Sequence, residues 1–247
     1  MPPQTAIIVA DAHISSRPDD AVTVAFQRFL VDVPKLGRHL VLNGDLFEFW
    51  FEYRSVIPRC VFPVLASLWD VVRQGVQLTV TGGNHDRWGG RFWMEQMGAD
   101  YHQRTVELDL AGWRALVGHG DGDIEPEFVS RAVHRVIGHP LTAAAFKTLH
   151  PDIGFWLVRK SSGILGRRKD DAGGTNKAAE AQARSARELL ERRTDLDLVV
   201  LGHTHSARLE AVAHNRWYLN PGAWMNGFEY AVVAAKGPEL RRFEGER

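Results

Sequence analysis

Five short segments of the chain carry side chains that can bind metal ions or transfer protons. Each follows a short apolar run, and they read Asp11-Ala12-His13, Asn43-Gly44-Asp45, Gly83-Asn84-His85-Asp86, Gly118-His119-Gly120-Asp121 and Gly202-His203-Thr204-His205. The carboxyl ends of strands in an α/β fold meet at one edge of the sheet, where ligands bind. We therefore expect the five segments to converge on a single site.

Two of the segments place paired ligands two residues apart. In extended backbone such side chains point the same way, so Asp11 with His13, and His203 with His205, should each reach one place. Glycines within the segments let the backbone turn and approach an ion closely. Imidazole, carboxylate and amide oxygen together suit Mn, Fe, Zn or Co better than Ca or Mg, which prefer oxygen-only shells.

The candidate metal ligands fit two ions better than one. They are Asp11, His13, Asp45, Asn84, His119, His203 and His205. We expect two divalent cations, manganese first and iron, zinc or cobalt as alternatives, sharing one carboxylate. Two ions roughly 3.5–4 Å apart can clamp a phosphoryl group during in-line displacement.

Two further residues are candidate catalytic residues, namely His85 and Asp86. His85 is left over from the ligand set and is either the general acid for the leaving oxygen or a stabiliser of transition-state charge. Asp86, like Asp121, is expected to orient imidazoles.

Each segment taken alone has a simpler interpretation. An Asp-x-His at a strand end is more often a turn with a capping histidine, and Gly-Asn-His-Asp suits a tight turn. Trp50, Trp88 and Trp93 could stack on a base or sugar, although core packing is favoured. The occurrence of all five segments after successive strands favours a metal site over coincidence.

The elements around the segments indicate an α/β fold with mixed sheets packed as a layered sandwich. Strands are expected at 6–10, 40–43, 76–81, 115–118 and 198–202, with helices at 21–33, 62–73 and 177–192. Alternating runs at 105–110, 208–212, 217–219, 230–234 and 239–243 predict antiparallel strands. Strands alternating with helices favour βαβ units.

One stretch departs from this pattern, from about 122 to 174. It contains helix-like pieces and no convincing strand, and 163–174 reads as a loop. We interpret the chain, 1–247, as a single domain with this helical insertion. Residues 131–169 carry eight Lys or Arg against one acidic residue, among many apolar side chains. Such a basic, apolar insertion suits an amphiphilic phosphate ester or an anionic membrane surface, the simpler alternative being packing onto the domain.

The composition of the chain excludes several classes of protein. The chain has 247 residues, 45% of them hydrophobic, and a formal net charge of +0, which excludes a globally basic nucleic-acid binder. The single cysteine, Cys60, cannot form an intrachain disulfide, so a reducing compartment is compatible. No apolar run approaches the roughly 20 residues of a membrane span. We expect a cytoplasmic protein, with the insertion as its candidate peripheral contact at the inner face of the membrane and no nucleic-acid partner.

The order of the motifs resembles the calcineurin-like metallophosphoesterases across residues 11 to 205. The resemblance implies a four-layer α-β-β-α sandwich around a dinuclear centre, with an inserted helical lid. It also implies one metal site with Asp11, His13, Asp45 and His205, and a second with Asp45, Asn84, His119 and His203. Asp45 would bridge the ions, and His85 would be the catalytic histidine.

A narrower resemblance concerns the substrate. The stretch Gly44 to Trp50, the insertion after Asp121, and the stretch His139 to Ser162 look like the UDP-2,3-diacylglucosamine diphosphatases of lipid A biosynthesis and their close relatives. In that subfamily the lid receives acyl chains. The correspondence makes Arg159 and Ser162, together with Asn84, candidate substrate-binding residues. The best-known members carry Gly-Asn-Arg-Asp, whereas this chain has His85, the pattern of the wider family.

The favoured function is therefore a metal-dependent hydrolase of a phosphodiester or pyrophosphate bond, with a UDP-diacylglucosamine-like nucleotide lipid as substrate. A broader phosphodiesterase or nucleotide phosphatase with the same centre is the first alternative. A non-catalytic interaction module of the same fold is less favoured, because every motif residue is present. A nuclease is disfavoured because the basic residues gather in one insertion, without an extended groove.

Overall fold

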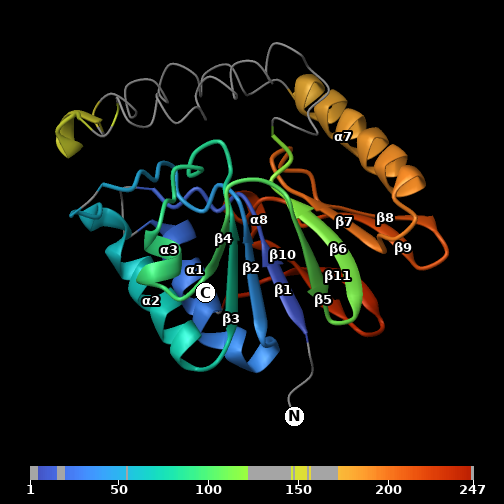
Figure 1. The fold of residues 1–247 in the computed structure, drawn as a ribbon, viewed down its shortest axis with the longest axis horizontal. Coiled ribbons are helices and arrows are strands. Elements are labelled where there is room, and N and C mark those ends of the chain that lie inside the picture. Colours follow the sequence, from blue (N-terminus) through green and yellow to red (C-terminus); the bar gives the residue numbers. More distant parts are fainter. Residues whose placement is uncertain are drawn as a thin grey trace.

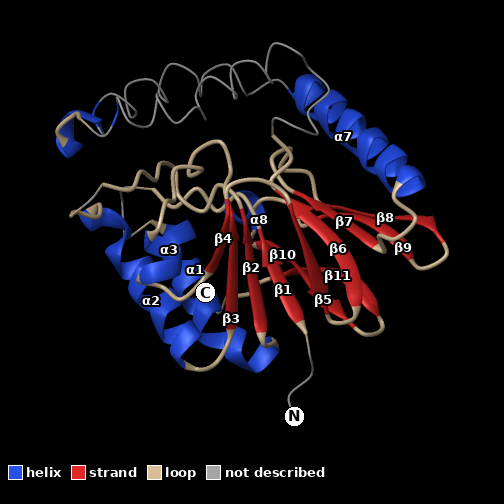
Figure 2. Ribbon diagram, viewed as in Figure 1, coloured by secondary structure: helices blue, strands red, loops and turns tan. Residues whose placement is uncertain are grey.

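Two mixed β-sheets pack face to face, and helices cover their outer faces (Figures 1 and 2). A computed structural model describes residues 5–15, 20–53, 55–121, 146, 148–154, 156 and 172–245. The expected α/β sandwich with two mixed sheets is confirmed.

The first sheet has the strand order β11-β10-β1-β2-β3-β4. Its parallel strands are β1 (Ala6–Val9), β2 (His39–Asn43), β3 (Gln77–Thr81) and β4 (Asp100–His102). The antiparallel strands β10 (Glu229–Ala234) and β11 (Gly237–Arg242) extend it beyond β1. Because β1, β2 and β3 are parallel, their carboxyl ends lie along one edge.

The second sheet has the order β5-β6-β7-β9-β8. Its parallel strands are β6 (Trp113–Gly118), β7 (Leu198–Leu201) and β9 (Arg216–Asn220). The strands β5 (Val106–Leu110) and β8 (Arg208–Ala213) close its two sides in antiparallel pairing. The loops that follow β6 and β7 meet those that follow β1, β2 and β3 at the same end of the sandwich (Figure 1).

The cores follow from the two-residue periodicity of the strands. In β1, Ile7 and Val9 pack into the core beneath the helices of the first sheet, whereas Ala6 and Ile8 pack into the core between the sheets. All four side chains are at most 2% exposed, which explains why the strand reads as a continuous apolar run.

Helices α1 (Ala21–Leu36) and α2 (Phe62–Arg73) cover the outer face of the first sheet. α1 begins at Asp20, whose carboxylate accepts a hydrogen bond from the backbone N–H of Thr23 at 2.7 Å, an N-cap. Its apolar residues recur at helical spacing and face the core, as Phe26, Phe29 and Val33 do. Short helical segments are η1 (Arg59–Val61), α3 (Phe92–Glu95) and α8 (Trp224–Gly227).

Helix α7 (Ala172–Arg192) covers the outer face of the second sheet through Ala183, Ala186 and Leu190. The prediction of a loop through residue 174 was wrong at its last three residues, which belong to α7. Most helical stability in proteins comes from packing of the apolar face, so Gly173 and Gly174 are tolerated in the first turn of α7. The backbone N–H groups of that turn have no intrahelical partners in any case. Most of the predicted insertion at 122–174 lies outside the described residues.

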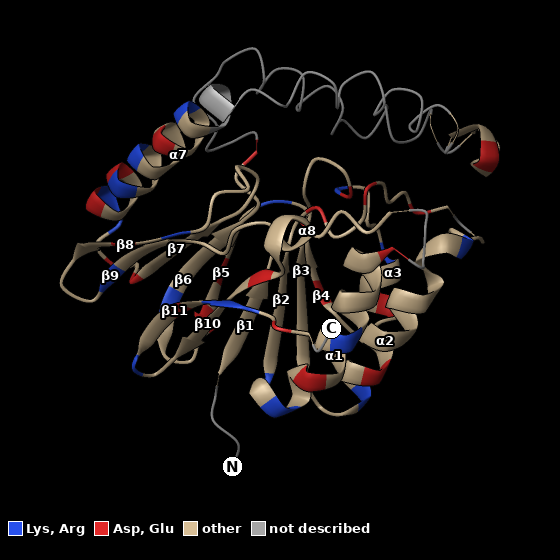
Figure 3. Cartoon of the chain, turned by 180° about the vertical axis from the view of Figure 1, so that it is seen from behind, with Lys and Arg blue, Asp and Glu red and all other residues tan. Residues whose placement is uncertain are grey.

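Within the described residues, no helix is long and apolar enough to cross a membrane. The longest helix that is described, α7, carries both acidic and basic residues along its length (Figure 3).

Candidate metal centre

The five segments that carry chemistry lie at one end of the sandwich, in the loops that follow parallel strands. Asp11 and His13 follow β1, Asp45 follows β2, and Asn84 and His85 follow β3. From the second sheet, His119 follows β6, and His203 and His205 follow β7. The expected convergence of these segments is observed, and the two sheets contribute to one site.

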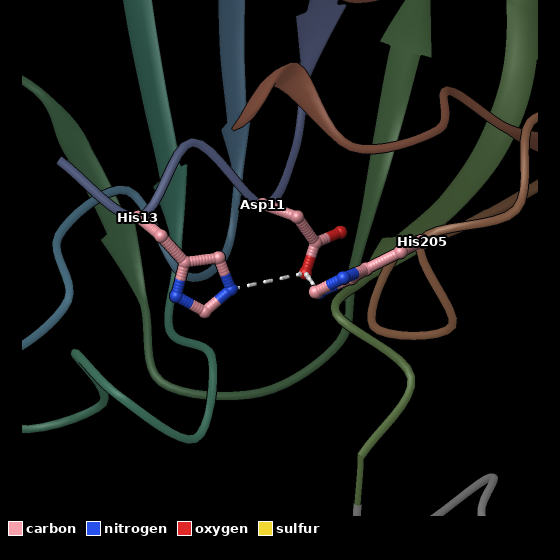
Figure 4. A group of neighbouring side chains, drawn as sticks. All are labelled: Asp11, His13 and His205. Carbon is pink, nitrogen blue, oxygen red and sulfur yellow. Dashed lines mark ion pairs between the residues drawn. The ribbon is translucent and has the colours of Figure 1, made fainter. Parts of the chain in front are cut away.

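The first group consists of Asp11, His13 and His205 (Figure 4). The Oδ1 atom of Asp11 lies 3.1 Å from Nε2 of His205 and 3.9 Å from Nε2 of His13. The two imidazoles come from different sheets and approach the carboxylate from opposite sides (Figure 4).

A second group consists of Asp45, His119 and His203. The Oδ2 atom of Asp45 lies 3.2 Å from Nε2 of His119, and the rings of His119 and His203 lie 5.2 Å apart. His203 and His205 therefore belong to different groups, although they are two residues apart in the sequence.

Asp45 also belongs to a third group, with His13 and His85. Its Oδ2 atom lies 3.7 Å from Nε2 of His13, and the rings of His13 and His85 lie 4.8 Å apart. In each of the three groups the potential ligand atoms lie within 4.8 Å of one another. The carboxylate of Asp45 thus stands between the other ligands, as a bridging ligand would.

Backbone carbonyls orient two of the imidazoles. The Nδ1 atom of His119 lies 3.0 Å from the carbonyl oxygen of Asn43, and Nδ1 of His85 lies 2.7 Å from that of Glu48. Since a carbonyl oxygen only accepts, Nδ1 is the donor in both, and Nε2 of each ring is left to face the centre. Such contacts fix the orientation of each imidazole ring.

The backbone of the ligands is left-handed rather than extended. The φ angles are 52° at Asp11, 43° at His13, 51° at Asp45, 69° at His203 and 54° at His205. The expectation of extended backbone at the paired ligands was therefore wrong, because β1 and β7 end before these residues. Asp11 and His13 nevertheless share one group, as expected, whereas His203 and His205 do not. Left-handed backbone costs about 1–3 kcal/mol at each non-glycine residue, and residues with this conformation are concentrated at functional sites.

The carboxylates at the centre are buried, and neighbouring imidazoles lower their pKa values. Asp11 is 0% exposed and Asp45 is 2% exposed. Burial would raise the pKa of Asp45, but His119 and the neighbouring imidazoles hold it well below its usual range. Burial would likewise lower the pKa of His119, yet the carboxylates of Asp45 and Asp11 raise it to about 9. For His13, burial prevails and lowers the pKa to about 4.

Four buried atoms of these residues lack hydrogen-bond partners. They are Oδ1 of Asp11, Nε2 of His13, Oδ1 of Asn84 and Nε2 of His119. Buried polar atoms are almost always hydrogen-bonded, so a cluster of such atoms without hydrogen bonds is unusual. The mixture of nitrogen and oxygen donors fits a transition-metal cation, and the residues present therefore fit the expected divalent ions.

Asp86 does not orient an imidazole, contrary to expectation. Its carboxylate accepts hydrogen bonds from the backbone N–H groups of Gly83 at 2.8 Å, Leu46 at 2.7 Å and Asp45 at 3.2 Å. Burial, with the nearby charge of Asp45, raises the pKa of Asp86 to about 6. Asp86 thus joins the loops after β2 and β3 and positions the backbone of Asp45. Asp121, the other residue expected to orient an imidazole, forms an ion pair with Arg87.

Gly83 leaves room for the carboxylate of Asp45. A Cβ atom at position 83 would lie 2.1 Å from Oδ1 of Asp45 and 2.5 Å from its backbone nitrogen. We expect Gly83→Ala to displace Asp45, to cost about 1–3 kcal/mol of stability and to lower kcat at least tenfold, measured by thermal unfolding and steady-state kinetics.

Gly112→Ala provides the control for that substitution. Gly112 has a φ of 90° and nothing within 4 Å of an added Cβ atom. Its replacement should lower stability through backbone strain and leave kcat unchanged. Wild-type kcat in Gly83→Ala would contradict the role of the close contact.

The aromatic candidates divide between core and loop. Trp50 and Trp93 are 0% and 1% exposed, so the favoured interpretation as core residues is confirmed for both. Trp88 is half-buried and packs against Phe51 and Phe146, with ring centroids 5.1 and 5.7 Å away. Arg159 and Ser162 lie outside the described residues.

Two supporting residues are not among the candidates that the sequence analysis names. Gln182 and Asn220 are 3% and 0% exposed and contact the loop of His203 and His205. The available signal was a polar residue, Gln182, on a helix face otherwise formed by alanines and leucine.

Comparisons with known proteins identify the family. The family described as Calcineurin-like phosphoesterase matches residues 5–207. The chain belongs to the calcineurin-like phosphoesterases, which confirms the resemblance of its motifs. It is a hydrolase of phosphoester or pyrophosphate bonds, and membership of this family implies divalent metal ions.

Two relatives have similar length. A protein named UDP-2,3-diacylglucosamine hydrolase from Porphyromonas gingivalis is 27% identical over 244 residues, covering 90% of this chain and 91% of the relative. A protein of the same name from Vibrio atlanticus is 24% identical and covers 96% of each chain. Among solved structures, Vacuolar Protein Sorting 29 from Cryptosporidium parvum has a TM-score of 0.49 and 14% identity, over 98% of this chain and 93% of that one.

Proposed function

We propose that this protein is a dinuclear metal-dependent phosphoesterase that hydrolyses a pyrophosphate bond in a UDP-diacylglucosamine-like nucleotide lipid. The observation that carries the proposal is the cluster of buried carboxylate, amide and imidazole atoms without hydrogen bonds around Asp45. Two relatives that span most of the chain bear the name UDP-2,3-diacylglucosamine hydrolase, which supports the substrate.

The proposed ligand sets meet at Asp45. Asp11, His13 and His205 form one set with Asp45, while Asn84, His119 and His203 form the other. The short distances from Asp11 to His205 and from Asp45 to His119 support this division. Nitrogen and oxygen ligands without a thiolate suit manganese, which we propose as the metal, with iron, zinc or cobalt as substitutes.

The bound ions would supply charge neutralisation at the phosphoryl oxygens and a water activated at neutral pH. Asp45 keeps its carboxylate between the two ligand sets, and its Oδ1 atom accepts a hydrogen bond from the backbone N–H of His85 at 2.8 Å. That hydrogen bond fixes the position of the His85 backbone. With Nδ1 on the carbonyl of Glu48, His85 presents Nε2 to the substrate, where it can protonate the leaving oxygen or stabilise negative charge.

We propose that the insertion at about 122–174 is a lid that binds the acyl chains of the substrate. Arg159 and Ser162 are the proposed contacts to the substrate, together with Asn84. Ile153 and Trp156 are 50% and 52% exposed and belong to the basic stretch 131–169. We propose this stretch as the peripheral contact at the inner face of a membrane, where a nucleotide lipid resides.

The substrate is tested by comparing two reactions in the same Mn²⁺-loaded enzyme. We expect Arg159→Ala to lower kcat/KM for UDP-2,3-diacylglucosamine at least tenfold, because a charge-assisted contact is lost. Hydrolysis of bis(p-nitrophenyl) phosphate, which lacks acyl chains and sugar, should be unchanged.

Arg73→Ala serves as the control, since Arg73 is exposed at the end of α2. An equal loss of kcat/KM on both substrates would mean that Arg159 acts in the hydrolysis step itself and does not recognise the nucleotide lipid. Absence of activity on the nucleotide lipid, with robust diester hydrolysis, would favour the broader phosphodiesterase, which the presence of His85 between Asn84 and Asp86 also favours.

A further inference from the structure

A buried polar network lies behind the loop that carries His203 and His205. Its centre is Gln182 of α7, 3% exposed. The Nε2 atom of Gln182 donates to the carbonyl oxygen of Gly202 at 3.0 Å. Its Oε1 atom accepts from the hydroxyl groups of Tyr218 at 2.8 Å and Thr204 at 3.2 Å. One side chain thus bonds to both the first residue of the loop and the residue between the two histidines.

This loop needs external support because its backbone is strained. The N–H of Thr204 donates to the carbonyl of Gly202 at 2.8 Å, which closes a three-residue turn around His203. His203 has a φ of 69°, and turns of this hand are rare and strained. Strained backbone persists only where the surroundings over-determine it.

The carbonyl that closes the turn is held by two side-chain amides. Besides Gln182, the Nδ2 atom of Asn220 donates to Gly202 at 3.2 Å and to Oγ1 of Thr204 at 3.0 Å. Gln182 also lies against the residue after His119, since a Cβ atom at Gly120 would lie 2.5 Å from its Nε2. Gln182 therefore touches two loops, one with His119 and the other with His203 and His205, and these histidines represent both ligand sets.

We propose that Gln182 is a positioning residue that holds His203 and His205 in the geometry that binds cations, acting through Gly202 and Thr204. The inference rests on the proposed metal centre and adds to it a specific support from α7. Because Gln182 contacts Gly202 and Thr204 of the ligand loop, its effect should appear in metal affinity rather than in substrate binding.

The test measures Mn²⁺ binding to the metal-free protein by isothermal titration calorimetry. We expect Gln182→Leu, which removes every hydrogen bond of the side chain, to weaken Mn²⁺ binding by about 10- to 100-fold, as loss of a ligand's supporting contact does. At low Mn²⁺ the kcat should fall, excess Mn²⁺ should restore it, and KM should stay constant.

A second variant, Gln182→Glu, keeps an oxygen for Tyr218 and Thr204 but loses the donor to Gly202. It should also bind Mn²⁺ at least tenfold more weakly, and it tests the same idea if Gln182→Leu does not fold.

Two control variants lie on the same helix. Leu190→Ala opens the core below α7 and should lower the melting temperature without changing Mn²⁺ affinity, while the exposed Arg184→Gln should change neither. Wild-type Mn²⁺ affinity in both Gln182 variants, with a melting temperature lowered as in Leu190→Ala, would overturn the inference and leave the proposed function intact. Absence of Mn²⁺ binding by the wild-type protein would overturn both.

Discussion

Replacement of Asp45 by asparagine is expected to reduce hydrolysis about a thousandfold or more. The carboxylate stands in two ligand groups and carries the negative charge that both proposed ion sites share. Bound cations contribute several kcal/mol to transition-state stabilisation, and each 1.4 kcal/mol or so is a factor of ten in rate. An amide keeps the shape and can still accept the hydrogen bond from the N–H of His85, so the loss should come from charge rather than from a collapsed loop.

Metal binding gives a second measurement on the same variant. Mn²⁺ should raise the melting temperature of the wild-type protein, because a ligand that binds only the folded state stabilises it. The increase should be greatly reduced in Asp45→Asn. Asp109→Asn removes an exposed carboxylate near the end of β5 and is the matched control, expected to behave as wild type. If Asp45→Asn keeps both the activity and the Mn²⁺-induced stabilisation, Asp45 is not a bridging ligand.

Replacement of His85 should lower kcat by about 10²- to 10⁴-fold while Mn²⁺ affinity stays within a few fold. Two variants distinguish the two roles considered for His85, general acid and stabiliser of transition-state charge. His85→Gln removes both the proton and the positive charge. His85→Arg keeps a positive charge but cannot donate a proton at neutral pH, because arginine stays charged. Recovery of activity in His85→Arg relative to His85→Gln therefore indicates charge stabilisation, and equal losses indicate a general acid.

The leaving group provides an independent check on the general acid. A p-nitrophenolate leaving group needs little protonation, so its hydrolysis should suffer less than hydrolysis of an alkyl phosphodiester if His85 is the acid. His214→Gln, at an exposed turn, should leave all rates unchanged. A large drop in Mn²⁺ affinity in His85→Gln would instead make His85 a ligand, consistent with its place beside His13 and Asp45.

Local sequence pattern was sufficient to predict most of the fold. The helix expected at 62–73 has those bounds, and the strands that precede the site agree within two residues. Buried strands and amphipathic helices have local periodicities, which a single sequence displays. The convergence of the candidate ligands could also be predicted, because the carboxyl ends of parallel strands meet at one edge whatever the identity of the intervening residues.

Other features arise only from contacts between distant segments. His203 and His205 serve different groups because left-handed backbone in the loop after β7 turns them apart. Asp86 binds the backbone of Asp45 and Leu46 across about forty positions of sequence. Gln182 reaches its loop from a helix that sequence pattern marks only as amphipathic.

The residue types and their order along the chain thus specify which groups can bind a cation and at which edge of the sheets they gather. Their division into ligand sets, and the residues that hold them, depend on tertiary contacts. The physical reason is that hydrogen bonds between loops overcome local backbone preference, at about 1–3 kcal/mol for each strained residue.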